Sequence, residues 1–303
     1  MSILKGVAVA LLSFLLLLSL TIFGIAFTLN NTVLNPDFVV SELEQLDITS
    51  LAGEAIREQI SQQIPPEAEV VTGILDEVID EVLEDVEPQI REQANAAVYA
   101  SYDYLLGRSE HLSLVISTGP IMESLKNSLR RVLLESPPPE LAILPPELLE
   151  QYFDQFYEEF TGEVPATIEF DESQLPAEDR TQLELARQYI GYFQTGYKVL
   201  IGFMVLLVAG IILIYRDVKR VTRSLGSTFL TYGIVEYGGI LAVKHFVLPS
   251  IPVAELPPPL QEWLPGVIGD FLAPLEMFSI GFLAAGIVLL VVSFVYKRRE
   301  SSL

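Results

Sequence analysis

The chain has no cysteine and only two histidines among its 303 residues. The lack of cysteine excludes disulfides, thiolate metal ligands and cysteine nucleophiles. The histidines, His111 and His245, fall in different segments of the chain, so we expect no histidine metal site. The sequence also lacks a phosphate-binding glycine loop, a Gly-x-Ser-x-Gly elbow and a His-Glu-x-x-His motif, each of which indicates a known enzyme chemistry. We therefore predict a protein that is not an enzyme and that uses no cofactor.

Basic residues are scarce too. The chain carries 18 Lys and Arg against 40 Asp and Glu, a formal net charge of −22. Such a charge repels the phosphates of nucleic acids, which excludes them as partners. Yet 50% of the residues are hydrophobic and the mean hydropathy is +0.43. A chain combines these properties when apolar spans alternate with an acidic soluble part.

Four stretches of the sequence approach the roughly 20 apolar residues that a helix needs to cross a bilayer. We predict an all-α membrane protein with four transmembrane helices and a mostly helical exported domain between the first and the second. The expected segments are a first transmembrane helix (1–30), the acidic exported domain (31–190), a second transmembrane helix (191–216), a cytoplasmic loop (217–223), a third transmembrane helix (224–248), a Pro-rich exported loop (249–274), a fourth transmembrane helix (275–296) and a basic cytoplasmic tail (297–303).

Basic residues predict the orientation of these helices, because Lys and Arg beside a span stay in the cytoplasm. Lys5 precedes the first span, four cations lie within 216–223, and three follow the fourth span at 297–299. All three groups share one side if four helices span, so we expect both termini to be cytoplasmic and the chain to lie in the cell membrane. The small residues Gly24 and Ala26 also permit signal-peptide cleavage, but the apolar run exceeds the usual roughly 7–15 residues and an uncleaved anchor is favoured.

Residues 31–198 contain 33 Asp and Glu against 9 Lys and Arg, so this segment holds nearly all of the negative charge. Helix-start and helix-stop residues predict a mostly helical domain with two short extended segments. The expected elements are helices that begin at Pro36 and near Ser50, an amphipathic helix over 70–83, a helix that Pro88 opens and Gly107 ends, an aromatic core helix from Tyr152 to Phe160, and extended segments at Leu112–Ile116 and Val164–Phe170.

Acidic residues recur at helical spacing between Asp76 and Asp85. Like charges four residues apart destabilise a helix by a few tenths of a kcal/mol, and a divalent cation would relieve the repulsion. Calcium, however, needs about six to eight converging oxygens. We therefore favour a solvated acidic face, with Arg130 and Arg131 as candidate ion-pair partners.

Three stretches resemble a loose group of uncharacterised bacterial four-span membrane proteins with a large exported helical loop. These stretches are Leu34-Asn35-Pro36-Asp37-Phe38, Tyr104-Leu105-Leu106-Gly107-Arg108-Ser109, and the Leu112 and Leu114 pair before the Pro120 helix. With the remaining spans, the resemblance covers most of the chain. It implies the same architecture, and it brings no activity and no catalytic residues.

Glu236 lies near the middle of the third predicted span, and Tyr232 precedes it by one helical turn on the same face. A charge at this depth costs roughly 2.5–3.5 kcal/mol, so Glu236 must face a cavity or a partner, or carry a proton. One interpretation is a proton or cation site formed by Glu236 and Tyr232. The other, which we favour, is a neutral carboxyl group hydrogen-bonded to a neighbouring helix.

Two further features concern the packing of the last two spans. Lys244 and His245 either pair with Glu276 or extend to the membrane interface, and the second arrangement is favoured. Small residues four positions apart predict close helix contacts within the bundle rather than between copies. These pairs are Gly238 with Ala242 and Gly281 with Ala285.

The leading functional hypothesis is a non-enzymatic envelope protein, anchored in the lipid bilayer, whose exported domain binds a partner protein, a lipid or a peptide. The alternative is an ion or solute transporter or channel that uses Glu236. Because four helices from one chain make a thin pathway, this alternative requires a homo-oligomer. A weaker third hypothesis is a signal relay, whose output needs another protein because the cytoplasmic segments are short.

Overall fold

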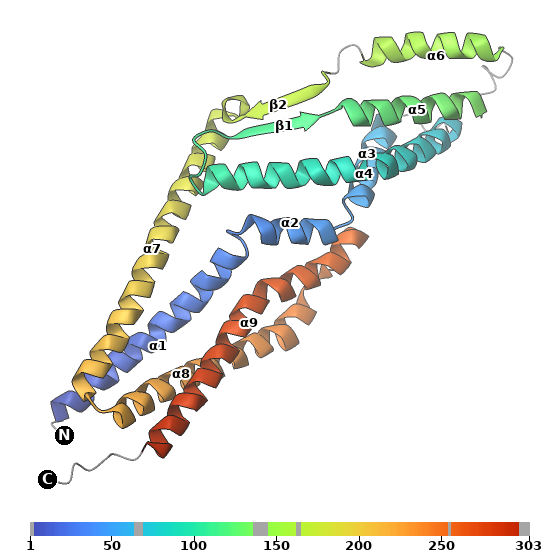
Figure 1. Ribbon diagram of the computed structural model, residues 1–303. Helices are drawn as coiled ribbons and strands as arrows, with labels where there is room; N and C mark the ends of the chain where they lie inside the picture. Colours follow the sequence, from blue (N-terminus) through green and yellow to red (C-terminus); the bar gives the residue numbers. More distant parts are fainter. Residues whose placement is uncertain (1–2, 64–68, 136–144, 162–164, 254–255, 297–303) are drawn as a thin grey trace. The chain divides into compact units, whose positions relative to one another are not determined.

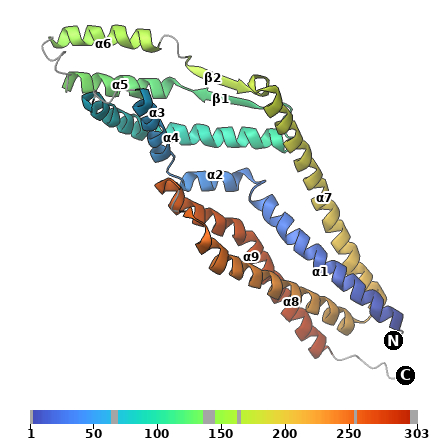
Figure 2. The same ribbon diagram turned by 180° about the vertical axis from the view of Figure 1, so that it is seen from behind.

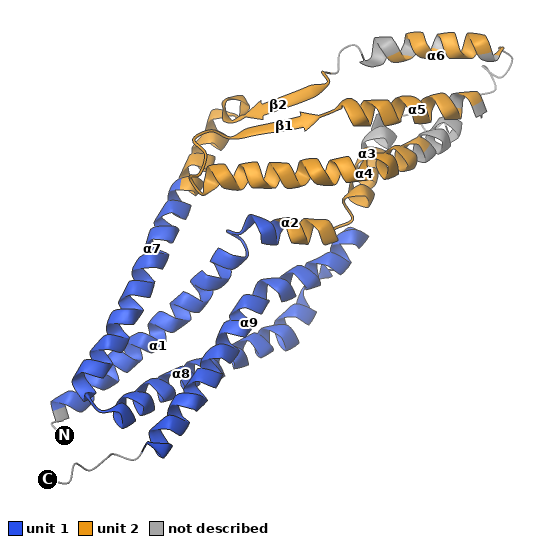
Figure 3. Cartoon of the chain, viewed as in Figure 1, with its two compact units in different colours: residues 1–39, 188–303 blue, residues 40–187 orange. Residues whose placement is uncertain are grey.

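The computed structural model in Figure 1 describes residues 3–63, 69–135, 145–161, 165–253 and 256–296. The chain divides into two compact units, which Figure 3 colours separately. Unit 1 comprises residues 1–39 and 188–303, and unit 2 comprises residues 40–187. Outside two short strands, the elements that the structure describes are helices, so the predicted all-α class is confirmed.

Unit 1 is built from long helices (Figure 1). They are α1 (Ile3–Asn31), the greater part of α7 (Ala177–Tyr215), α8 (Val218–Ala242) and α9 (Pro258–Val295), with a π-helical turn (Val243–Val247) and a 3₁₀ turn (Leu248–Ser250) after α8. Among the described residues, α1, α7 and α9 are long and apolar enough to cross a membrane. These three helices indicate a membrane protein. The predicted third span corresponds to α8, which is not among them.

Two helices begin earlier than the predicted spans. The second predicted span starts at residue 191, and α7 is already helical from Ala177, which confirms the helical pattern that the sequence shows from about Pro176 into this span. The segment 249–274, expected as a loop, is helical from Pro258 onward. A helix tolerates proline at its first positions, because the N–H group that proline lacks has no hydrogen-bond partner there. The proline-rich composition therefore marks the start of α9, although Pro265 and Pro274 lie inside the helix.

The backbones of α8 and α9 approach each other closely. Because Gly226 lies beside Gly286 and Gly233 beside Ser279, the two helices run antiparallel. A Cβ atom built on Gly286 would lie 2.6 Å from the backbone nitrogen of Leu230. Small residues at intervals of seven positions line the contact, namely Gly226 and Gly233 on α8 and Ser279, Gly286 and Ser293 on α9. Such residues let helices pack in lipid, where no hydrophobic effect drives association.

The glycines that we predicted for this role do not form the contact. A Cβ atom built on Gly238 or on Gly281 would meet nothing within 4 Å. The prediction relied on a spacing of four residues, whereas the contact uses a spacing of seven. A seven-residue period keeps one face of each helix against its partner over several turns, which a single four-residue pair does not.

Helices α1 and α7 complete the core of unit 1. The stacked rings of Phe23 on α1 and Tyr197 on α7 have centroids 5.3 Å apart, and Phe278 of α9 lies 5.4 Å from Phe23. The buried apolar residues come from three helices, Val9, Leu16 and Leu20 of α1, Leu207 and Ile211 of α7, and Leu225 and Tyr232 of α8. The helices of unit 1 therefore share one core.

Unit 2 contains shorter helices and a small sheet. Its elements are α2 (Pro36–Gln45, which begins in unit 1), α3 (Ile48–Gln63), α4 (Glu69–Leu105), β1 (Ser113–Ser117), α5 (Gly119–Glu135), α6 (Pro146–Thr161), β2 (Thr167–Asp171), a 3₁₀ turn (Glu172–Gln174) and the first turns of α7. The predicted helix start at Pro36 is confirmed, and Asn35 Oδ1 accepts a hydrogen bond from the Asp37 N–H at 3.1 Å. This is the usual side-chain cap of a helix N-terminus.

Helix α4 is one helix, whereas we predicted that Pro88 would open a new one. Proline inside a helix removes a hydrogen bond and costs about 3 kcal/mol or more. A continuous apolar stripe offsets this cost, because Val82, Val86 and Ile90 pack on α5 on both sides of Pro88. Gly107 follows the end of α4 with a φ of 73°, as a helix-ending glycine does.

The aromatic helix α6 packs against α5. Phe153 and Tyr157 are buried, and the Tyr157 hydroxyl donates a hydrogen bond to the Met122 carbonyl oxygen. Lys126 of α5 lies over the Tyr157 ring, 5.1 Å from its centroid. The predicted core role is confirmed for these two aromatic residues. The side chains of Tyr152, Phe156 and Phe160 lie outside the described part of the chain.

Strands β1 and β2 form an antiparallel ribbon. Ser113 pairs with Asp171 at one end, and Ser117 pairs with Thr167 at the other. Figures 1 and 2 show β1 lying between β2 and α4. Both strands fall within or beside the segments predicted to be extended, although Val164 lies outside the described residues. The pairing between them was not predicted.

The replacement Gly286→Ala should destabilise unit 1, because its Cβ atom would press on the backbone of α8. Over-packed sites lose about 1–3 kcal/mol, so we expect a lower melting temperature in detergent micelles. Gly281→Ala on the same helix is the control, since its Cβ atom meets open space and alanine favours a helix by about 1 kcal/mol over glycine. Equal melting temperatures for the two variants would contradict the close contact.

Candidate functional site

Glu236 and Tyr232 lie one helical turn apart on one face of α8. Tyr232 is 1% exposed, and Glu236 is half-buried. No hydrogen bond joins the two side chains. Within the described residues, we find no hydrogen bond or ion pair to the Glu236 carboxyl group. The structure thus places the two predicted residues side by side and gives Glu236 no neighbouring-helix partner there.

The Tyr232 ring points from α8 into the junction of α1 and α9. Its ring packs edge-on against Phe278 and Phe282 of α9, with centroids 5.9 and 5.5 Å away. Its hydroxyl group lies beside Gly24 of α1, where an added Cβ atom would come within 2.5 Å of the oxygen. The absence of a side chain at Gly24 therefore leaves the space that the Tyr232 hydroxyl occupies.

Most buried hydroxyl groups of unit 1 donate to backbone carbonyl oxygens. Thr28 donates to Gly24 at 3.0 Å, Thr32 to Thr28 at 2.6 Å, and Ser293 to Lys219 at 3.0 Å. The Tyr232 hydroxyl differs, because it has no hydrogen-bond partner among the residues described. An unsatisfied buried polar group costs about 1–3 kcal/mol. Such groups in native proteins indicate a bound water, an ion or a functional role.

A charged pair follows at the end of α8. Lys244 lies in the π-helical turn, and its ammonium group contacts the Glu276 carboxylate of α9. This is the first of the two arrangements predicted for Lys244, and not the one that we favoured. His245 does not join the pair, since its Nδ1 lies 3.2 Å from the Leu241 carbonyl oxygen. π-Helical turns recur at functional sites, and this one follows the helix that carries Glu236.

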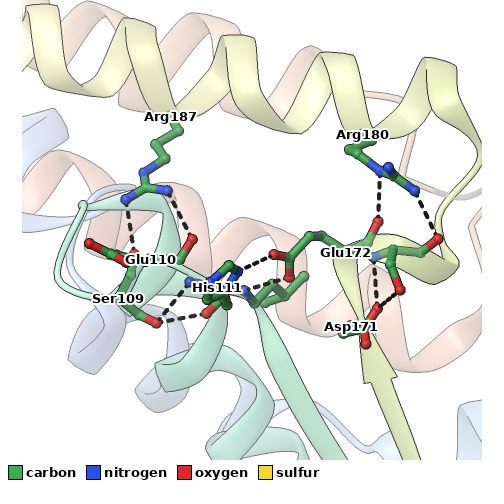
Figure 4. Close-up of polar contacts among 9 residues, drawn as sticks. Ser109, Glu110, His111, Asp171, Glu172, Arg180 and Arg187 are labelled. Carbon is green, nitrogen blue, oxygen red and sulfur yellow. Dashed lines mark hydrogen bonds and ion pairs between the residues drawn. The ribbon is translucent and has the colours of Figure 1, made fainter.

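A second polar cluster lies in unit 2, where the β-ribbon meets α7 (Figure 4). His111 Nδ1 lies 2.7 Å from Glu172 Oε1, and Glu172 Oε2 accepts the Leu112 N–H at 2.9 Å. Arg180 donates to the Glu172 and Ser173 carbonyl oxygens at 3.0 and 2.8 Å. These contacts join the segment before β1 to the turn after β2, at one end of the ribbon, and fasten that turn to α7.

Arg187 completes this cluster from α7. It donates to the Ser109 carbonyl oxygen at 2.9 Å and to the Glu110 carbonyl oxygen at 3.4 Å, and its guanidinium group lies over the Tyr104 ring. Both α7 arginines thus bond to backbone oxygens. They fix the ribbon rather than offering a free cation to a ligand.

Ser109, His111 and Glu172 include the residue types of a hydrolytic triad, but their geometry differs. In a triad, the serine oxygen bonds to the imidazole ring. Here the Ser109 hydroxyl donates to the His111 carbonyl oxygen at 2.7 Å, and accepts the His111 N–H at 3.3 Å. The imidazole is bonded on one side to Glu172 and is not bonded to the serine. This cluster therefore holds a loop and does not activate a nucleophile.

The acidic stripe of α4 is partly neutralised within unit 2. Asp80 contacts Arg57 and Glu81 contacts Arg131, while Asp85 accepts a hydrogen bond from Ser124 at 3.0 Å. Arg131 was one of the two predicted partners, whereas Arg130 pairs instead with Glu150 of α6. Asp76 and Glu77 have side chains outside the described part. Among the residues that the structure describes, no group of histidine, aspartate and glutamate side chains is arranged to hold a metal ion.

Two sets of residues with a structural role were not predicted from the sequence. The first set is the small residues of the α8–α9 contact and Gly24, which a search at seven-residue spacing on the two helices would have found in part. The second is the His111–Glu172 pair, whose members lie 61 positions apart. Only the pairing of β1 with β2 brings them together, and no local pattern indicates that pairing.

No protein-family model matches the chain, and comparison with curated proteins and with solved structures finds no similar protein.

The His111–Glu172 pair has a defined dependence on pH. The hydrogen bond and charge of Glu172 raise the pKa of His111 above its ordinary 6.5, and the same contact lowers the pKa of Glu172 below 4.5. The pair stabilises the fold between those ordinary values. Its contribution is lost as the pH rises through the raised pKa of His111 or falls through the lowered pKa of Glu172. Because the His111 side chain is 80% exposed, the effect on unfolding is small and the pKa is the better observable.

The replacement Glu172→Gln should move the pKa of His111 down toward 6.5. The imidazole signals can be followed by NMR on the full-length protein in nanodiscs, with His245 as an internal reference. Glu110→Gln is the matched control, because Glu110 raises the same pKa less than Glu172 does. An unchanged His111 pKa in Glu172→Gln would show that the pair does not form.

Proposed function

We propose that the chain is a four-span protein of the cell membrane whose unit 2 lies on the outer side and binds a positively charged partner protein or peptide. The observation that carries the proposal is the charge of unit 2. Residues 40–187 contain 32 Asp and Glu against 8 Lys and Arg. This excess attracts cationic partners, repels anionic lipid headgroups and accelerates encounter with a partner of opposite charge.

The few cations of unit 2 are engaged within it, which leaves most acids uncompensated. Five arginines pair with carboxylates, Lys126 lies over a tyrosine ring, and two α7 arginines bond to backbone carbonyl oxygens. The pairs are Arg57–Asp80, Arg91–Glu87, Arg108–Asp103, Arg130–Glu150 and Arg131–Glu81, and the α7 residues are Arg180 and Arg187. A partner that supplies positive charge therefore meets a large excess of acids in unit 2.

In this proposal helix α8 also crosses the membrane, as the third of four spans in chain order. It packs backbone to backbone on α9, a helix of membrane length. Lys244, in the π-helical turn that follows α8, is neutralised by Glu276 of α9, which lowers the cost of burying its charge in hydrocarbon. With four spans, the basic residues near 5, 216–223 and 297–299 share the cytoplasmic side.

The binding function can be tested with the full-length protein in nanodiscs of zwitterionic lipid. An oligolysine peptide should bind above the level of empty nanodiscs, and oligoglutamate of equal length should not. The affinity should fall between about 0.1 M and 1 M salt, as the Debye length shortens from about 10 Å to about 3 Å. Oligolysine binding equal to that of empty nanodiscs would refute the proposal.

A second candidate function is proton or cation movement at Glu236, as part of an oligomer. Two observations favour it, the half-buried Glu236 without a described partner and the buried, unpartnered hydroxyl of Tyr232 one turn away. Ionisable residues within a span face a water-filled path or a partner group, and they recur in proton relays. Tyr232 and Glu236 supply a hydroxyl and a carboxyl group, which exchange protons with water.

Replacing Glu236 by Gln should abolish any protein-dependent proton flux in reconstituted vesicles under an imposed potential. The amide keeps the volume of the side chain and cannot release a proton. Glu92→Gln, at an exposed position of α4, is the control and should leave the flux unchanged. Identical flux in Glu236→Gln and in the unmodified protein would eliminate this second function.

A further inference from the structure

The two edges of the β-ribbon differ in what covers them. On β1, the Gln93 side chain of α4 closes the outer edge, because its amide bonds to the Ser117 N–H at 2.7 Å and to the Ser117 carbonyl oxygen at 3.1 Å. One side chain thus replaces a neighbouring strand at that position. The outer edge of β2 carries the Gln174 amide, which donates to the Glu169 carbonyl oxygen at 2.9 Å. No other hydrogen bond to that edge is found in the described residues.

The hydrogen bonds of Gln93 also define the register of the free edge. Both backbone groups of Ser117 point away from β2, so Ser117 and its partner Thr167 form a non-hydrogen-bonded pair. In an antiparallel ribbon such pairs alternate with bonded ones. The backbone groups of Thr167, Glu169 and Asp171 therefore point outward, and the contact of Gln174 with Glu169 agrees with this register. The N–H groups of Thr167 and Glu169 have no described partner.

Apolar and polar side chains alternate along β2, so the two faces of the strand differ. Ile168 and Phe170 share a face with their β1 partners and form an apolar stripe, in which Ile168 is 43% exposed. Thr167, Glu169 and Asp171 lie on the opposite face, and all three are exposed. A strand added at this edge would place alternate side chains beside the apolar stripe and beside the two acids.

We propose that the outer edge of β2 is a binding site for an extended cationic peptide, which pairs antiparallel with residues 167–171. Its alternate residues are apolar opposite Ile168 and Phe170, and basic opposite Glu169 and Asp171. This site rests on the proposed function of unit 2 as a binder of positive charge, and it specifies the place and the conformation of the ligand.

Three physical features favour an extended cationic peptide at this edge. A two-stranded ribbon is only marginally stable alone, and a third strand extends its hydrogen-bonded ladder and places its own apolar side chains beside the apolar stripe. The acids of the edge and the net negative charge of unit 2 favour lysine and arginine over acidic residues in the ligand. The Glu169 carbonyl oxygen keeps a second lone pair, so it can accept a peptide N–H while it is bonded to Gln174.

The first test uses the end-blocked peptide Lys-Val-Lys-Val-Lys and the full-length protein in zwitterionic nanodiscs. In the proposed register, the lysine N–H groups point to β2 and the valine N–H groups point away. N-methylation of the lysine amides should weaken binding roughly tenfold or more, because it removes the ladder hydrogen bonds and keeps the charge. N-methylation of the valine amides is the matched control and should preserve binding. Equal affinity of all three peptides would overturn the edge site.

A second test changes the protein. Thr167→Pro removes an outward N–H without altering charge, and an edge strand tolerates proline where the N–H faces solvent. It should weaken Lys-Val-Lys-Val-Lys binding, whereas Thr167→Val, which keeps the N–H, should not. Thermal melting of both variants verifies that the ribbon remains folded. Unchanged peptide affinity in folded Thr167→Pro would overturn the proposal.

The outcomes separate the site from the function on which it rests. Binding of oligolysine together with insensitivity to lysine N-methylation would refute the edge site and leave the charge-based function standing. Failure of oligolysine and of Lys-Val-Lys-Val-Lys alike would refute both. Sensitivity to lysine N-methylation, with tolerance of valine N-methylation, would support both.

Discussion

The backbone contact between α8 and α9 is the constraint on which unit 1 depends. Lipid tails are as apolar as leucine, so helices in a bilayer associate through close packing and hydrogen bonds rather than through hydrophobic burial. Gly233 and Gly286 provide that closeness, because a Cβ atom at either position would lie within 3 Å of the opposing backbone. The seven-residue repeat keeps the two helices in register. This register directs the ring of Tyr232 against Phe278 and Phe282 and places its hydroxyl group beside Gly24.

In unit 2 the organising forces are different. Apolar packing of α4 on α5 is strong enough to hold a proline inside a helix, and the arginines join elements that are distant in sequence. Arg180 and Arg187 bond to carbonyl oxygens rather than to carboxylates. Positive charge is thus used for internal structure, while most of the negative charge remains on the surface. The same division leaves unit 2 with a large excess of acids over cations.

Local patterns predicted much of this fold. Hydropathy located the long helices, the Asn35-Pro36 signal located the start of α2, and two short apolar segments marked β1 and β2. Failures arose where packing overrode local preference. Pro88 did not interrupt α4, because the stripe from Val82 to Ile90 packs across it. Glu236 and Tyr232 were found because a carboxyl group in an apolar run is a local anomaly. The role of Gly24 depends on a contact between helices, which no local pattern indicates.

The surroundings of Tyr232 constrain what Glu236 can do. A conducting pore needs a continuous polar lining, whereas Tyr232 is enclosed by two phenylalanine rings and a glycine. The buried hydroxyl groups of Thr28 and Thr32 on α1 donate to backbone carbonyl oxygens, so their protons are already engaged. For the proton movement proposed above, exchange at Glu236 would therefore need either water that enters beside Tyr232 or a group from a second copy of the chain. Within that proposal, the exchange would be a local event at one carboxyl group rather than conduction along a continuous polar pore.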